Sequence, residues 1–328
     1  MSEMFNLNLI EGVYNKFGNK IERIYNNKNE IIWDLDDGSN DYFWVYEVDN
    51  PESLGSMGYI YFKHATDGIG LEQDAIMYSW DRKTWNYFTQ YFDEIKAYGV
   101  LLNRVPKKIY FKYTKSYFDD IRIVGGYVDM NSRLKLKCKI GGSLHKFVND
   151  NYFFEGYNMF GAGQLDDVNN VFFSGLDITD AQNLRLDYYE GNIPEYGYRG
   201  MFYNQFNLVY APKTIGGYNT YIHHYGCKQM FRGCKELIYA PILNSGTLYD
   251  RAYEEMFFDC RNLNVIQCYA HNFNILTGEE ENFDPFYLWG LGDSEYTRNG
   301  TFYKYKNVVL PGDPIPYGWD VHEIDMTN

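Results

Sequence analysis

Residues 198–212 read YRGMFYNQFNLVYAP, residues 227–241 read CKQMFRGCKELIYAP, and residues 253–266 read YEEMFFDCRNLNVI. These are three copies of one pattern, because their Met-Phe pairs begin 230 − 201 = 29 and then 256 − 230 = 26 residues apart. A period of this length is typical of repeat proteins built from stacked units. Since a unit so short cannot bury its apolar side alone, we expect the copies to stack on one another.

Within each copy, the apolar positions predict a short helical segment followed by a short strand. In the second copy, Cys227, Met230, Phe231 and Cys234 are spaced by 3, 1 and 3, which fits one buried helical stripe. The Leu-x-x-Ala-Pro that follows indicates a brief extended stretch, ended by a proline that has no amide hydrogen for a ladder.

Composition places the chain among globular proteins and narrows its ligands. Its 328 residues are 45% hydrophobic, and 34 are tyrosine, whose apolar ring and polar tip suit surfaces that meet partners or sugars. The net charge of −14 argues against nucleic acid, because phosphate contacts need clustered Lys and Arg. Residues 1–18 contain no secretory signal pattern, and no apolar run approaches the about 20 residues of a membrane helix. We therefore expect synthesis in a cytoplasm, with neither nucleic acid nor membrane as partner.

The cysteines predict reduced, buried thiols that act as small core residues. There are five, an odd number, at Cys138, Cys227, Cys234, Cys260 and Cys268. Their Cys-x6-Cys and Cys-x7-Cys spacings do not match those of zinc ligands, so we expect no metal site.

Residues 1–40 predict a small N-terminal β-meander. VYN at 13–15 returns as IYN at 24–26, and aromatic or β-branched residues separated by Asn, Gly and Lys indicate strands joined by turns. So small a meander needs a packing partner. It is therefore a candidate docking element, with Tyr14, Tyr25 and Trp33 as candidate docking residues.

Residues 41–138 predict a β-sandwich of immunoglobulin-like size. Aromatic or aliphatic residues alternate with polar ones at 42–48 and 59–63, residues 76–85 indicate strand, turn and strand, and residues 107–112 indicate a further strand. Several short strands at near-regular spacing are typical of such a sandwich.

Several stretches together resemble the BspA-like leucine-rich repeat proteins, also known by their bacterial surface protein 26-residue repeat. The three copies are similar to the family pattern YxxMFxxCxxLxxAP, and the closing stretch NGTFYKYKNVVLPGDPIPYGWDVHEID (299–325) resembles the family's C-terminus. MYSWDRKTWNYFT (77–89) and KKIYFK (107–112) resemble elements that precede such repeats in bacterial surface proteins and in virion proteins of gut phages. IERIYNNKNEIIWD (21–34) resembles N-terminal segments of tail and fibre proteins of those phages. The sequence departs from the pattern at Gln205, where Cys is usual, at Cys227, where Tyr is usual, and after Ile266, where Pro is missing.

This resemblance implies a structural and adhesive component of a bacteriophage virion, of the kind found in crAss-like phages of Bacteroides. It implies a repeat solenoid over residues 139–328, with caps at 139–197 and 302–321. A head fibre, tail fibre or appendage subunit would bind other virion proteins through its N-terminal module and a host-surface glycan or protein through its repeats. Such proteins are commonly dimers or trimers, and the virion in which this chain would reside assembles in the host cytoplasm.

The sequence does not support catalysis, and we predict a protein that is not an enzyme and has no cofactor. Adjacent acids occur at 119–120, 166–167 and 279–281, but neighbours on a strand point to opposite faces and neighbours in loops are usually solvated. The acidic run at 34–41 fails the calcium-loop pattern, since Ser39 replaces the required Gly and Val45 the required Glu. Two alternatives stay open: a capsule polysaccharide depolymerase and an exported bacterial surface adhesin.

Tyrosines of the repeats are the candidate binding residues. If the Leu of each copy faces the core, Tyr210, Tyr239 and Val265 occupy one column across neighbouring strands, although alternation alone does not decide whether that column is exposed. The segments connecting the copies add the candidates Tyr218, Tyr221, Tyr225 and Tyr249.

The sequence therefore predicts a mainly β protein, α+β overall, in three parts. These are an N-terminal β-meander (1–40), an immunoglobulin-like β-sandwich (41–138) and a capped leucine-rich-repeat-like solenoid (139–328).

Overall fold

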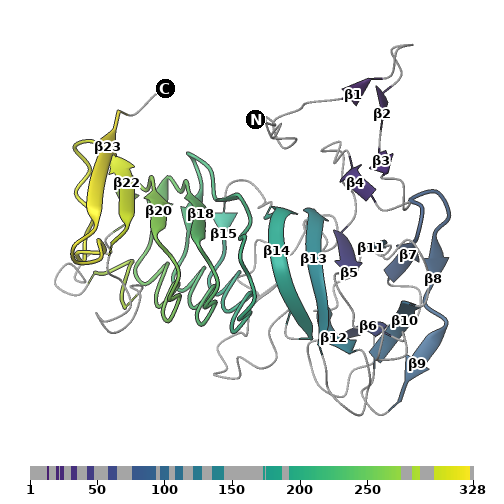
Figure 1. The fold of residues 1–328 in the computed structure, drawn as a ribbon. Helices are drawn as coiled ribbons and strands as arrows, with labels where there is room; N and C mark the ends of the chain where they lie inside the picture. The colour runs from purple at the N-terminus through teal and green to yellow at the C-terminus, as the bar shows by residue number, and fades with distance from the viewer. Residues whose placement is uncertain are drawn as a thin grey trace. The chain divides into compact units, whose positions relative to one another are not determined.

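The computed structural model of the chain is mainly β (Figure 1). The structure describes residues 13–14, 20–21, 23–25, 31–34, 43–47, 58–64, 76–93, 97–102, 108–113, 121–127, 135–143, 173, 175–186, 192–274, 283–288 and 299–325. Every regular element in these ranges is a strand, β1 to β23, which confirms the predicted mainly β class. By their internal contacts the residues form two units, Met1–Asp41 and Tyr42–Asn328.

The first unit contains two short hairpins. β1 (Val13–Tyr14) pairs antiparallel with β2 (Lys20–Ile21), and β3 (Arg23–Tyr25) pairs antiparallel with β4 (Ile31–Asp34). The strands predicted around the two copies of the Tyr-Asn motif are thus present.

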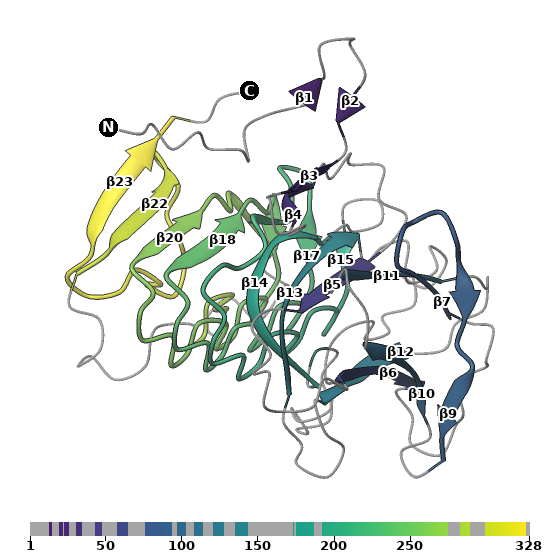
Figure 2. The same cartoon turned by 45° about the vertical axis from the view of Figure 1, so that its right-hand side comes forward.

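Two sheets begin the second unit, with strand orders β12-β6-β10-β9 and β14-β13-β5-β11-β7-β8 (Figure 2). The strands are β5 (Phe43–Glu47), β6 (Gly58–His64), β7 (Ile76–Ser79), β8 (Asn86–Tyr87), β9 (Gln90–Phe92), β10 (Ala97–Leu102), β11 (Lys108–Tyr113), β12 (Ile121–Tyr127), β13 (Leu136–Ser143) and β14 (Leu176–Arg185). They include the strands predicted at 42–48, 59–63 and 107–112 and the first of the two predicted at 76–85, whereas the second, β8, begins one residue after that range. Phe62 of one sheet and Phe111 of the other are fully buried, with ring centroids 4.8 Å apart, so the two sheets share an aromatic core.

The carboxylate of Asp81 holds the turn between β7 and β8. Its Oδ1 accepts the amide hydrogens of Lys83 and Thr84 at 2.8 and 2.7 Å, and the Ser79 hydroxyl at 3.0 Å. These bonds favour the ionised form, and the amides of Thr84 and Lys83 in particular lower the pKa of Asp81 to about 2. The motif SWDRKTW therefore specifies a tight turn.

β13 and β14 join the sheets to the repeats. β13 pairs antiparallel with β5 on one side and parallel with β14 on the other. The expected boundary at 138/139 falls inside β13, between Cys138 and Lys139, and residues 42–328 form one unit. β14 continues the same sheet into the repeats, because Asp180 bridges to Tyr210, and Tyr210 bridges in turn to Tyr239.

The stacked repeats form two sheets of parallel strands, with strand orders β15-β17-β19-β21 and β16-β18-β20-β22-β23 (Figure 1). The first sheet consists of β15 (Asn192–Ile193), β17 (Tyr221–Ile222), β19 (Thr247–Leu248) and β21 (Asn272–Phe273). The second consists of β16 (Thr214–Ile215), β18 (Tyr239–Leu243), β20 (Val265–Cys268), β22 (Thr301–Tyr305) and β23 (Asp320–Ile324). Equivalent residues of successive copies are therefore neighbours in space.

The helical segment expected in each copy was wrong: the structure has turns there. Alternate amides bond within the copy and to the next copy. Met201 N–H donates to the Tyr198 carbonyl at 3.2 Å, whereas Phe202 N–H donates to the Met230 carbonyl at 2.9 Å. In an α-helix every amide would donate to the carbonyl four residues earlier in the same segment. Here half of the amides donate to the next copy instead, so stacking of the copies excludes the helix. The spacing of 3, 1 and 3 remains, but it belongs to four-residue turns.

Every fourth residue of these turns has a positive φ. The nine residues, three per copy, are Tyr196, Gly200, Asn204, Tyr225, Gln229, Gly233, Arg251, Glu255 and Asp259. Only two of them are glycine, so the stacked arrangement holds the other seven in a conformation that L-residues rarely adopt.

A row of phenylalanines connects the core of the sheets to that of the repeats. Centroid distances are 5.9 Å from Phe43 to Phe173, 5.3 Å from Phe173 to Phe202, 5.2 Å from Phe202 to Phe231, and 5.8 Å from Phe231 to Phe257. All five side chains are fully buried. The hydrophobic core is thus continuous from β5 to the third copy.

Gln205, which stands where the other two copies have Cys, bonds to the segment before the first copy. The Ile178 amide donates to Gln205 Oε1 at 2.9 Å, and Gln205 Nε2 donates to the Phe173 carbonyl at 3.0 Å. At the equivalent position of the next copy, the Cys234 thiol donates to the Phe202 carbonyl at 3.1 Å. The longer Gln side chain therefore satisfies backbone groups of a neighbour that is not a repeat.

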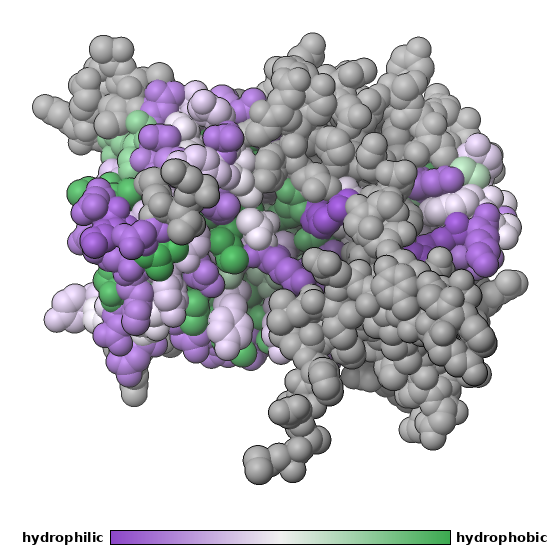
Figure 3. Space-filling model, turned by 90° about the horizontal axis from the view of Figure 1, so that it is seen from above, coloured by the Kyte–Doolittle hydropathy of each residue, from purple (hydrophilic) through white to green (hydrophobic). Residues whose placement is uncertain are grey.

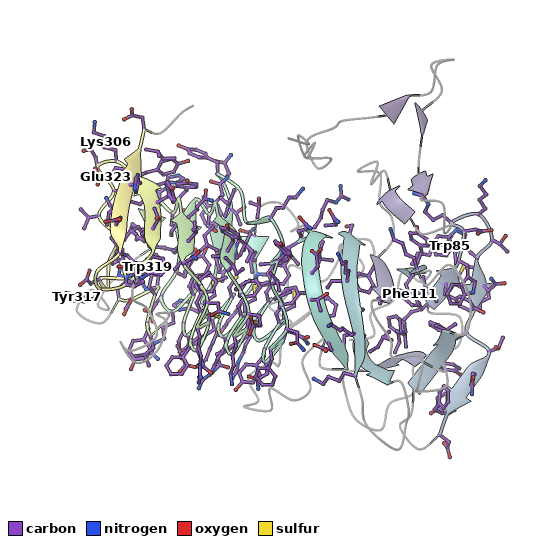
Figure 4. All side chains as sticks on the ribbon, viewed as in Figure 1. Trp85, Phe111, Lys306, Tyr317, Trp319 and Glu323 are labelled. Carbon is purple, nitrogen blue, oxygen red and sulfur yellow. The ribbon has the colours of Figure 1, made fainter. Side chains whose placement is uncertain are left out.

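The C-terminal segment covers the other end of the repeats. Trp319 is buried against Gly300, where any added Cβ would overlap the indole ring (Figure 4). Lys304 Nζ forms a 2.6 Å ion pair with Glu323 and donates to the Val308 carbonyl at 3.1 Å.

Candidate binding surface

Residues on the outer face of the five-stranded sheet form two columns across its strands, and the first column extends past the sheet through Tyr210 to the buried Asp180 of β14. Burial alternates along β20, where Ile266 and Cys268 are buried and Val265 and Gln267 are partly exposed. The backbone pairing then defines each column. The first column consists of Asp180, Tyr210, Tyr239, Val265, Thr301 and Asp320. The second column consists of Thr214, Ile242, Gln267, Tyr303 and His322.

The structure exposes the two tyrosines that the sequence placed in one column. Tyr210 is 46% exposed and Tyr239 is 53% exposed, and a parallel bridge makes them direct neighbours. The Ala181 amide donates to the Tyr210 carbonyl at 2.8 Å, which fixes this backbone to β14. The two exposed tyrosines thus occupy neighbouring positions on a hydrogen-bonded backbone.

The other four candidate tyrosines do not join this column. Tyr221 is 45% exposed but lies on β17 of the four-stranded sheet. Tyr225 stacks on Tyr196 at 5.1 Å, and Tyr249 stacks on His223 at 4.5 Å. These contacts between neighbouring copies give Tyr225 and Tyr249 a packing role.

Tyr218 belongs to an aromatic cluster at the end of β22, beside the two columns. Its ring stacks on His271 at 4.5 Å, and His271 lies 6.0 Å from Tyr305, which in turn lies 5.1 Å from Tyr269. Burial raises the pKa of Tyr269, and the nearby Tyr305 and Tyr303 add to the shift. The Tyr269 hydroxyl therefore keeps its proton, which it donates to Gln267 Oε1 at 3.2 Å.

Sequence reasoning missed Gln267, Tyr303 and His322 of the second column. Tyr303 and His322 pack with ring centroids 5.3 Å apart. The pattern of β20 repeats the earlier copies and could have placed Gln267. β22 and β23, however, follow a longer stretch of different sequence, so only the observed pairing brings Tyr303 and His322 beside it.

Several charged side chains on the turns form ion pairs between neighbouring copies. Lys228 and Glu254 form a 2.6 Å ion pair, and Arg232 pairs with Glu255. Burial lowers the pKa of His223, and His224 lowers it further, while Glu195 opposes both. Over the described ranges, no three Asp, Glu, His or Cys side chains gather as metal ligands. The two columns, in contrast, present mainly aromatic rings and uncharged hydrogen-bonding groups.

All five cysteines are buried, as predicted. Burial raises the pKa of the Cys227 and Cys260 thiols, and it raises that of Cys268 to about 12. These thiols are therefore protonated and serve as core residues.

The candidate docking residues Tyr14, Tyr25 and Trp33 lie on β1, β3 and β4, and their side chains lie outside the described atoms. The acidic stretches at 119–120, 166–167 and 279–281 also lie outside the described residues.

No helix among the described residues has the length and apolarity to cross a membrane. Comparison with known proteins found no matching family model, no matching curated protein and no matching solved structure.

Proposed function

We propose that this chain is a non-enzymatic binding protein, built as an immunoglobulin-like sandwich joined to a capped leucine-rich-like solenoid. The observation that carries the binding role is the pair of exposed tyrosines, Tyr210 and Tyr239, on neighbouring hydrogen-bonded positions. Tyrosine is enriched at recognition surfaces because its ring offers contact area with little flexibility to lose. A continuous core and sheet behind these rings hold them ready for a ligand.

The proposed place of action is a bacteriophage virion, as a head fibre, tail fibre or appendage subunit that contacts the surface of a gut bacterium. The resemblance of the repeats, the closing stretch and residues 21–34 to virion proteins supports this placement. The N-terminal unit would attach the chain to other virion proteins, and the mature form would be a homodimer or homotrimer.

Mass spectrometry of purified virions tests this placement. We expect peptides of the chain at a constant ratio to the major capsid protein across the density gradient. Recovery from the envelope of uninfected bacteria, and not from particles, would favour an exported adhesin. Steady release of reducing ends from host capsule would instead identify a depolymerase.

A further inference from the structure

The two columns combine aromatic rings with polar groups and contain few charged side chains. Of their eleven residues, only Asp180 and Asp320 are acidic, and none is Lys or Arg. Asp180 is already paired with Lys139 at 3.4 Å and accepts two bonds from Gln182 at 3.0 Å. An anionic ligand would find no cation in either column.

We propose that these two columns bind a neutral glycan chain that lies across the strands. This inference rests on the proposed function and specifies its ligand class. From Tyr210 to Asp320 the first column crosses four strand intervals, a span of roughly 19 Å at about 4.8 Å per interval. That span suits an extended oligosaccharide whose successive sugars meet successive strands.

The chemistry of the columns matches the two kinds of surface that a sugar offers. The exposed rings of Tyr210 and Tyr239 present flat apolar faces to C–H groups. Gln267, Thr301 and His322 lie on the strands that follow Tyr239 across the sheet, β20, β22 and β23, and supply an amide, a hydroxyl and an imidazole for sugar hydroxyls. Tyr269 engages the Gln267 oxygen, so within the described residues the Gln267 amide hydrogens remain available.

Contacts among side chains of this face hold the polar groups in place before any ligand arrives. Tyr303 packs on His322, and Tyr269 both packs on Tyr305 and bonds to Gln267. Preorganised side chains lose less entropy on binding, which matters for a shallow surface with few contacts per sugar. A protein partner fits this face less well, because the only aliphatic side chains in the columns, Val265 and Ile242, have polar or aromatic neighbours.

Affinity electrophoresis of the full chain tests the proposal. Native gels would contain neutral polysaccharides (yeast mannan, dextran, barley β-glucan or larch arabinogalactan) or anionic ones (alginate or chondroitin sulfate). We expect at least one neutral polysaccharide to retard the chain and the anionic ones to leave its mobility unchanged. In the retarding gel, Tyr239→Ala and Gln267→Ala should each weaken binding about fivefold or more.

The matched control is Tyr221→Ala, which removes an equally exposed tyrosine from the four-stranded sheet. It should bind as the unmodified chain does, and all three variants should keep its melting temperature within about 2 °C. The proposal is overturned if no neutral gel retards the chain, if anionic gels retard it as much, or if Tyr221→Ala loses as much binding as Tyr239→Ala.

The gels and the virion test can fail independently. A chain that is present in purified virions but unretarded in every neutral gel would overturn the glycan proposal and leave the virion placement intact. If the chain is absent from particles but a neutral gel retards it in a way that depends on Tyr239, the virion placement fails and the glycan proposal stands.

Discussion

Individual residues in the turns adopt a strained backbone, and the stacking of copies compensates for it. An L-residue in the left-handed region loses roughly 1 kcal/mol or more relative to glycine. Contacts with a neighbouring copy offset this cost: Tyr225 stacks on Tyr196 with ring centroids 5.1 Å apart. Glu255 accepts a 2.6 Å hydrogen bond from Gln229 and pairs with Arg232. Positive φ at a Tyr or Glu is therefore tolerated where a neighbouring copy supplies a partner.

Asp259 and Gly233 occupy the same turn position and predict opposite responses. Asp259 has φ 61°, and among the described residues its side chain pairs with the exposed Arg261, so Asp259→Gly should raise the free energy of unfolding by about 0.5–1 kcal/mol. Gly233→Ala should lower it by about 1–2 kcal/mol, since the new Cβ would overlap the Asn204 amide oxygen in a left-handed conformation. Thermal denaturation measures both, and a shift of the same sign in both variants would contradict the turn geometry.

Asp81 predicts a pH-dependent turn. Its pKa is lowered to about 2 in the folded chain from 3.8, so its stabilising contribution is complete above about pH 4. The contribution is lost as the pH falls through 2. We expect the difference in melting temperature between the unmodified chain and Asp81→Asn to be largest near neutral pH and to vanish toward pH 2. A carboxyl titration midpoint near 4 by NMR would refute the assigned hydrogen bonds.

At the scale of elements, β14 serves as the first strand of the repeats without repeating their sequence. Its Ile178 amide donates to Gln205 Oε1, whereas Cys234, at the equivalent position of the next copy, donates its thiol hydrogen to the Phe202 carbonyl. Gln205, where the other copies have Cys, therefore joins the first copy to β14, which is not a repeat.

Replacing Gln205 with Met, which has a similar volume, should leave the Ile178 amide without its partner. We expect a loss of about 1–3 kcal/mol in the free energy of unfolding, the usual cost of an unsatisfied buried polar group. Chemical denaturation measures it. Cys234→Ala, at the equivalent position of the next copy, removes a weak thiol donor and one buried sulfur atom and should cost less. Equal losses would show that Gln205 has no special role at the junction.

At the scale of the molecule, the six-stranded sheet continues into the five-stranded sheet, and the described residues of the second unit share one core. β5, β13 and β14 lead through Tyr210 into β18, and the phenylalanine row runs from Phe43 to Phe257. A continuous core predicts that the sheets and the repeats unfold together.

Phe173 is the ring that links the two halves of this core, so it tests the coupling. In the unmodified chain, hydrogen exchange of the amides of Phe111 and Phe231 should report one common opening free energy. Phe173→Ala should cost about 3–5 kcal/mol and separate the two values. Phe257→Ala, at the far end of the row, should lower the opening free energies of both amides by the same amount. Different opening free energies in the unmodified chain would rule out a shared unfolding unit.

The sequence by itself determined strands β5, β6, β7 and β11 of the first sheets, the stacking of three copies, the burial of the cysteines and the common column of Tyr210 and Tyr239. These features follow from alternation, spacing and side-chain type, which act locally. Only the tertiary structure decided that the copies contain turns rather than helices, because the competing hydrogen-bond partners lie in neighbouring copies. It also decided which face the tyrosine column occupies and that Tyr303 and His322 stand beside Gln267. Long-range strand pairing sets both, and no local pattern in β22 or β23 encodes that pairing.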